Sequence, residues 1–270
     1  MQIQALKHQE EGLRSITERS IVIAFLFFIG TGSAVAVEIS NMDEAVNVAG
    51  RQRMLSYRIV KDYLMVSMEN RYKNPKEDLE KSIALFEASQ AALKGYKEDK
   101  ELQALLAEVD KVFEKEKLMV SSSFDKAKGE NYLAQANALK AAAHKVVLRL
   151  EKLSGKKGAA IINKAGRLRA LSQRINLLYL LKTMEIESSL LADEMAKAMA
   201  ILKESLDFLA KEGSSGELID KELKKLKKIQ RFYQIMSQSD NFVPTIITKK
   251  SDRMVKYANE LIALYLKHTK

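Results

Sequence analysis

Residues 47–59 read NVAGRQRMLSYRI, and residues 163–175 read NKAGRLRALSQRI. The two stretches lie 116 residues apart, and 13 of 23 positions are identical between 47–69 and 163–185, without a gap. Self-similarity at a fixed spacing indicates a duplicated structural unit. Neither stretch contains Pro, and both are rich in Ala, Leu and Arg, so we expect both copies to be helical.

An arginine and a glycine on one helical stripe are the unusual feature of each copy. Gly50 and Arg53 share this stripe at about 100° per residue, and Gly166 and Arg169 repeat them. A helical Gly costs about 1 kcal/mol relative to Ala, and close approach of a second helix is one reason to keep it. If two such helices cross, two guanidinium groups meet, which is unfavourable unless an anion lies between them. The alternative is that both arginines reach solvent or pair with Asp and Glu.

The motif Asn-x-Ala-Gly-x-x-Arg-Met-x-Ser-x-Arg resembles the signature of the PilJ-type, or NarX-like, sensory domain. That domain is the periplasmic part of nitrate/nitrite sensor kinases and of some type IV pilus and chemotaxis receptors. The first copy is similar at nearly every motif position, whereas the second has Ala170 where Met is usual. The resemblance implies a four-helix bundle in which nitrate or nitrite binds between two first helices of a dimer, held by the arginine that matches Arg53 and Arg169.

The candidate binding residues are the stripe arginines and glycines, together with the later arginine and the serine of each copy: Arg53, Arg169, Gly50, Gly166, Arg58, Arg174, Ser56 and Ser172. Because the motif occurs twice, we hypothesise that the two copies pair within one chain and form the site between Arg53 and Arg169. Arg58 and Arg174 are expected to brace the site through acidic neighbours, and the serines are secondary candidates. Outward-facing glycines would instead require a second polypeptide in a homodimer.

The composition favours an all-α protein with a basic surface. The chain has 270 residues, of which 47% are hydrophobic and 7% aromatic, with two Pro and no Trp. It has no Cys, which excludes disulfides and thiolate metal sites. The net charge of +10 attracts anions, but no concentrated basic stripe or known module indicates a nucleic-acid partner.

Three segments follow from the hydrophobic pattern. Residues 1–37 are expected to be a signal peptide or an N-terminal membrane anchor, because 20–37 carry no charge. The Ala-x-Ala pattern that ends at Ala36 favours cleavage, whereas an uncharged run of 18 residues is just long enough to span a bilayer. Residues 38–155 and 156–270 are then two tandem four-helix modules. Either treatment of the leader places both modules in the periplasm.

Apolar periodicity and turn residues predict four helices in each module. Asn74-Pro75 is expected to cap the second helix, Gly129 to end the third, and the glycines within 154–158 to form a hinge or a kink. The expected helices are 38–72, 76–94, 100–127, 132–153, 159–191, 193–211, 218–237 and 245–268.

Catalysis has no support in the sequence, and we expect no metal or cofactor. The three His are scattered, and His144 is expected to be an ordinary helix residue. We therefore expect an exported, non-enzymatic sensory or binding protein that captures a small oxyanion, with nitrate or nitrite favoured by the resemblance. No second span or signalling domain follows, so output would need a partner such as a membrane receptor or sensor kinase. The alternatives are a ligand-free helical adaptor or structural protein docking on such a receptor, and, more distantly, a membrane-perturbing protein.

Overall fold

The computed structural model describes residues 36–186, 190–212, 216–239 and 242–268. Within these ranges the chain is helical and contains no strand, which confirms the predicted all-α fold. The predicted export segment lies outside the described residues, apart from its last two positions. No helix of the described part combines the length and apolarity needed to cross a membrane.

Eight α-helices and one short 3-10 helix make up the described chain: α2 (Met42–Ser67), α3 (Pro75–Tyr96), α4 (Lys100–Val120), η1 (Lys126–Lys128), α5 (Gly129–Ser154), α6 (Lys157–Thr183), α7 (Leu190–Glu212), α8 (Glu217–Ser237) and α9 (Pro244–His268). The observed helices correspond one to one with the eight that the sequence predicts. Asn74 caps α3 as expected, because its side chain accepts from the backbone N–H of Glu77 and Pro75 follows in the first turn.

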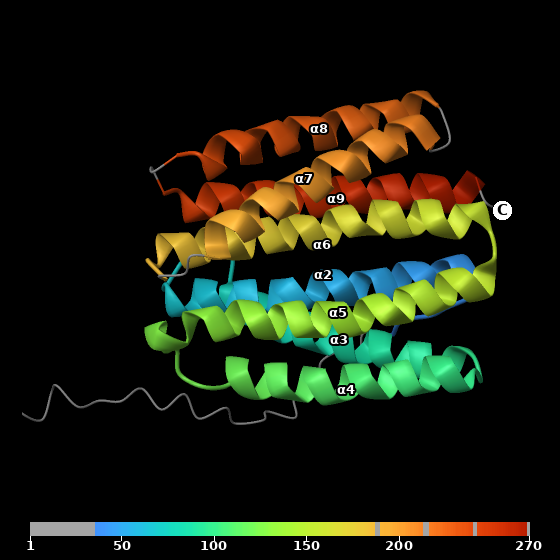
Figure 1. Ribbon diagram of the computed structural model, residues 1–270, viewed down its shortest axis with the longest axis horizontal. Helices are drawn as coiled ribbons and strands as arrows, with labels where there is room; N and C mark the ends of the chain where they lie inside the picture. The colour runs from blue at the N-terminus through green and yellow to red at the C-terminus, as the bar shows by residue number, and fades with distance from the viewer. Residues whose placement is uncertain (1–35, 187–189, 213–215, 240–241, 269–270) are drawn as a thin grey trace, which may run out of the picture.

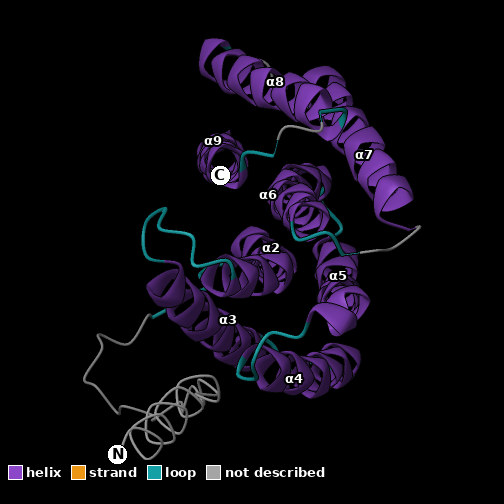
Figure 2. Ribbon diagram, turned by 90° about the vertical axis from the view of Figure 1, so that its left-hand side faces the viewer, coloured by secondary structure: helices purple, strands orange, loops and turns teal. Residues whose placement is uncertain are grey.

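Two parallel helices, α2 and α6, lie side by side in the middle of the molecule (Figure 1). Their mutual packing is the most extensive of any helix pair. Helices α3 and α5 flank α2, and α4 packs on α5, whereas α7 and α9 flank α6 and α8 covers them (Figure 2). Each central helix is therefore surrounded by neighbours, so its polar side chains must find partners inside the protein.

Both central helices end earlier than the sequence predicts, and for the same reason. After α2, Glu69 adopts a φ of 50°, and after α6, Glu185 adopts a φ of 53°. The chain then turns back, because the N–H groups of Asn70 and Ile186 donate to the carbonyls of Met65 and Leu181. This is the helix ending that glycine usually provides, and here a repeated glutamate takes its place.

Two glycine predictions are resolved by the structure. The prediction for Gly129 was wrong: Gly129 begins α5 rather than ending the preceding helix, which stops at Val120. A Cβ at Gly129 would lie 2.2 Å from Cγ2 of Ile186, so any larger residue at the start of α5 would force the side chain of Ile186, just after α6, to move. The break at 154–158 is a reversal between two separate helices, and Gly155, with a φ of 62°, ends α5.

Candidate functional site

Arg53 of α2 and Arg169 of α6 meet in the interface between the two central helices, and each side chain is only 2% exposed. A Cβ built on Gly50 would lie 3.3 Å from the Nη2 atoms of both arginines. A Cβ on Gly166 would lie 3.3 Å from Arg169 Nη2 and 3.4 Å from Arg53 Nη2. The two glycines therefore leave the space that the two guanidinium groups occupy together, within a single chain.

Each arginine crosses to the asparagine that begins the other copy of the repeat. Arg53 Nη2 donates to the backbone oxygen of Asn163 at 3.2 Å, and Arg169 Nη2 donates to the backbone oxygen of Asn47 at 3.1 Å. Helical side chains lean toward the N-terminus of their own helix, which brings both guanidinium groups back to the level of these asparagines. The exchange is nearly two-fold symmetric.

The remaining partners of the two arginines break this symmetry. Arg53 Nη1 donates to Asn163 Oδ1 at 2.7 Å and lies 3.2 Å from His144 Nδ1 on α5. Arg169 Nη1 donates instead to Asn259 Oδ1 on α9 at 3.0 Å. The expectation that His144 is an ordinary helix residue was therefore wrong, because its ring nitrogen contacts the buried guanidinium.

Neither arginine forms an ion pair with a carboxylate of the described residues. Glu151 accepts a hydrogen bond from Asn163 Nδ2 rather than from Arg53, and it attracts the Arg53 guanidinium at longer range. The Nε atoms of both arginines are buried and have no hydrogen-bond partner. Burial, together with repulsion from Arg167, lowers the pKa of Arg53 to about 9, and attraction to Glu151 opposes this decrease. Burial also lowers the pKa of Arg169 to about 9, with Arg51 and Arg53 adding repulsion. Two positive charges thus face each other in the protein interior without a carboxylate ion pair, and in the described part of the chain only Arg53 has a nearby carboxylate, Glu151, that offsets part of its charge.

The third arginine of each copy lies near the arginine pair and has an acidic partner. Arg58 Nε is 3.5 Å from Asp62 Oδ2, one turn later on α2. Arg174 Nη2 contacts Glu194 of α7. Asp62 also contacts Lys61, so Arg58 shares its acidic partner, and the bracing role expected of Arg58 and Arg174 stays a prediction.

The two serines do not belong to this site, which corrects their place among the candidates. Ser56 Oγ donates to the carbonyl of Gln52 within its own helix at 2.9 Å. Ser172 Oγ lies 3.0 Å from Tyr233 Oη and 3.0 Å from Ser251 Oγ, between α6, α8 and α9. Both are fully buried in helix packing, and neither contacts a guanidinium.

Sequence reasoning left out the asparagines as ligands of the arginines, although Asn47 and Asn163 open the two repeats. Their recurrence was a usable signal. Asn259 and His144 carried none, because they come from helices outside the repeated stretch.

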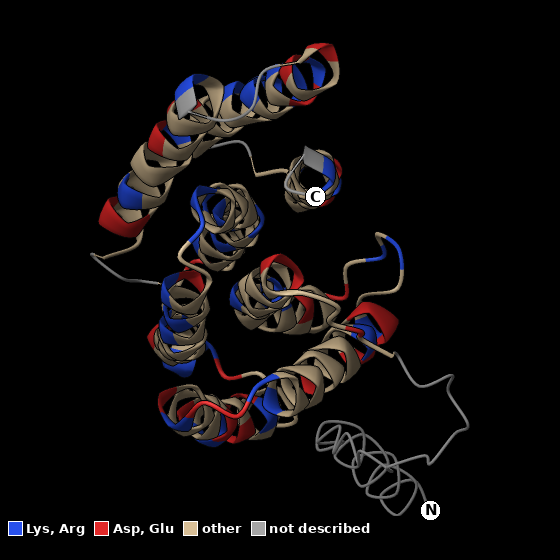
Figure 3. Cartoon of the chain, turned by 90° about the vertical axis from the view of Figure 1, so that its right-hand side faces the viewer, with Lys and Arg blue, Asp and Glu red and all other residues tan. Residues whose placement is uncertain are grey.

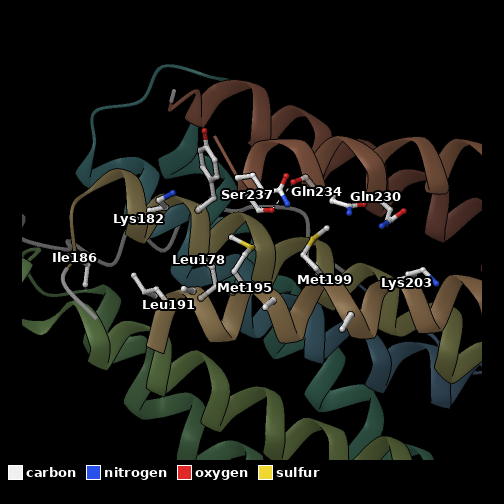
Figure 4. Close-up of a pocket in the computed structure, with 15 residues that line it drawn as sticks. Leu178, Lys182, Ile186, Leu191, Met195, Met199, Lys203, Gln230, Gln234 and Ser237 are labelled. Atoms are coloured by element: carbon white, nitrogen blue, oxygen red, sulfur yellow. Dashed lines mark hydrogen bonds between the residues drawn. The ribbon is translucent and has the colours of Figure 1, made fainter. Parts of the chain in front are cut away.

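A larger cavity lies elsewhere, between α6, α7 and α8, with a volume of about 760 Å³. Figure 4 shows Met195 and Met199 of α7 facing Gln230 and Gln234 of α8 across it. Neither Arg53 nor Arg169 lines this cavity. Among the described residues, no cluster of three or more His, Asp or Glu has the arrangement of a metal site.

Comparison with known proteins gives a match for the N-terminal part of the chain. No curated protein and no solved structure matches the chain. A family model does: residues 36–146 match PilJ, described as "Type IV pili methyl-accepting chemotaxis transducer N-term". The match covers α2, α3, α4 and most of α5, including Gly50 and Arg53. Residues 36–146 are therefore similar to the N-terminal domain of type IV pili chemotaxis transducers, which is a sensory and non-catalytic domain.

Proposed function

We propose that the chain is an exported sensory protein that captures one small oxyanion between Arg53 and Arg169. The observation that carries this proposal is the pair of buried guanidinium groups, neither in an ion pair with a carboxylate of the described residues, held between Gly50 and Gly166. An anion there would offset their repulsion and accept from the Nε–H groups that now lack acceptors. Nitrate or nitrite is favoured, because a planar oxyanion fits the planar fork of each guanidinium.

Anion capture would also change how the two central helices are linked. In the structure, each guanidinium joins α2 to α6 by donating to an asparagine carbonyl on the other helix. An anion competes for the same N–H groups, so binding exchanges two interhelical hydrogen bonds for contacts with the ligand. A ligand with different affinities for the two arrangements shifts the population between them, which is the requirement for a signal.

The proposed organisation follows the sequence repeat. Residues 38–155 and 156–270 are two copies of the domain in tandem, and their first helices form within one chain the pair that the resemblance implies for a dimer. Residues 1–37 direct export or anchor the chain, which places the site in the periplasm. The signal passes to a membrane receptor or sensor kinase, with a homodimer as a further level of assembly.

Titration calorimetry at constant ionic strength tests this function with nitrate, nitrite and chloride. The variants Arg53→Gln and Arg169→Gln should each lower nitrate affinity about 10- to 100-fold, since a hydrogen bond to a charged group contributes about 1.5–3 kcal/mol. Arg231→Gln is the matched control, because this exposed arginine of α8 lies away from the pair. Equal nitrate affinity in all four proteins, or no binding, would refute the site and leave a ligand-free adaptor as the better account.

A further inference from the structure

A separate cavity of about 150 Å³ lies beside the paired arginines, between α2, α5, α6 and α7. We call it the flank pocket, and its polar lining consists of five basic side chains and one tyrosine: Arg53, Lys140, His144, Arg167, Arg174 and Tyr57. A water molecule occupies about 30 Å³ in the liquid. The flank pocket therefore has room for a small polyatomic anion and a few waters.

The charges of the flank pocket are poorly balanced. Arg174 is paired with Glu194. Arg53, Lys140 and Arg167 form no ion pair with any carboxylate in the described ranges, so three cations share one small cavity. Lys and Arg occur on the central helices of the molecule as well as on its outer helices (Figure 3).

The excess of positive charge affects the pKa values of the groups in the flank pocket. Burial lowers the pKa of Lys140, and repulsion from Arg53, Arg174 and Arg167 lowers it further. Burial likewise lowers the pKa of His144 to about 4, with repulsion from the same cluster adding to it. Arg53, fully buried, also has an Nε without an acceptor. Each of these features would be relieved by negative charge in the cavity.

The cavity on the opposite side of the arginine pair has fewer basic side chains than the flank pocket. There, Arg169 lines a wider cavity of about 360 Å³ together with Arg51 and Arg58. Lys140 and His144 are replaced on that side by Val255 and Asn259, which lie 115 residues later and line the wider cavity. The two cavities are lined by arginines from corresponding positions of the repeat, but only the flank pocket adds an ammonium group and an imidazole ring.

We propose that the flank pocket is a second anion site, which binds a divalent tetrahedral oxyanion of the sulfate or hydrogen phosphate class. Two negative charges match three unpaired cations better than one does, and four oxygens offer acceptors to donors from α2, α5 and α6 at once. The pocket shares Arg53 with the proposed nitrate site but does not depend on that function.

Calorimetric titration of the full chain with sulfate and with phosphate, at constant ionic strength, tests the proposal. Arg167→Gln and Lys140→Val should each lower affinity for both anions at least about ten-fold, because each removes a charge-assisted contact. The matched control is Arg51→Gln, which removes the equivalent arginine from the opposite flank and should change affinity less than about two-fold. Circular dichroism melting verifies that each variant folds, and Arg167 is only half-buried.

Three results would overturn the proposal: no binding of sulfate or phosphate at tens of millimolar, unchanged affinity in Arg167→Gln and Lys140→Val, or equal losses in Arg167→Gln and Arg51→Gln. Failure of the nitrate site is distinguishable. Arg169→Gln removes a central guanidinium that does not line the flank pocket, so it should lower nitrate affinity about 10- to 100-fold and leave sulfate affinity unchanged.

Discussion

Replacing Gly50 by alanine tests whether the paired guanidinium groups are held where the structure places them. A Cβ at this position would lie 3.3 Å from Nη2 of both Arg53 and Arg169. Ordinary carbon–nitrogen contacts are longer than this, so both groups must shift by a few tenths of an ångström. The same Nη2 atoms donate to the carbonyls of Asn163 and Asn47 at 3.2 and 3.1 Å, close to the limit of a good hydrogen bond.

The magnitude follows from two opposing effects. Alanine in place of a helical glycine stabilises by about 1 kcal/mol. Weakening one or both of the interhelical hydrogen bonds costs about 1–2 kcal/mol, since each contributes about 1 kcal/mol net. We therefore expect Gly50→Ala to change the free energy of unfolding by between zero and about −1 kcal/mol. Nitrate affinity should fall at least ten-fold, because the new methyl group occupies the space between the guanidinium groups.

Gly95→Ala is the matched control. Gly95 is also helical, in α3, but a Cβ there would meet no atom within 4 Å. This variant should gain about 0.5–1 kcal/mol and retain full nitrate affinity. The assay is urea unfolding followed by far-UV circular dichroism, with calorimetry for binding. If Gly50→Ala gains as much as Gly95→Ala and binds nitrate equally well, the guanidinium groups do not lie between the glycines.

Three further predictions concern stability. Glu116 is fully buried, neither of its carboxylate oxygens has a hydrogen-bond partner, and burial raises its pKa. Its ionisation therefore opposes folding once the pH rises above the pKa of glutamate in the unfolded chain. Glu116→Gln should increase the free energy of unfolding by about 1–3 kcal/mol at pH 7, measured by urea unfolding, and by progressively less toward pH 4. Glu185→Gly should raise the unfolding free energy by about 0.5–1 kcal/mol, since it relieves a left-handed backbone, and a loss would contradict the turn geometry. Burial lowers the pKa of His144 from 6.5 to about 4, so protonation of His144 should cost stability as pH falls from about 6.5 to 4. The full shift corresponds to about 3 kcal/mol, which solvent screening of the partly exposed ring reduces to about 1–2 kcal/mol, and thermal melts of His144→Asn should lack that share of the decline.

The sequence was sufficient for the local features of the fold. Helical periodicity gave all eight α-helices, and the Asn74-Pro75 pair gave the start of α3. Such features depend on side chains within a turn or two of each other, so a linear pattern contains them. Helix ends were less accurate, because Glu69 and Glu185 take a conformation that sequence patterns reserve for glycine.

The sequence by itself also determined that two glycines and two arginines recur at one spacing on helices that could cross. Only the tertiary structure decided that Arg53 contacts Asn163 and His144. It also decided that Ser56 and Ser172 form hydrogen bonds away from the arginines, and that three cations without an ion pair lie together on one side of the arginine pair. The physical reason is that these contacts join helices far apart in the chain. Which side chains meet there depends on the angle, register and spacing of the packed helices, and no local pattern specifies those.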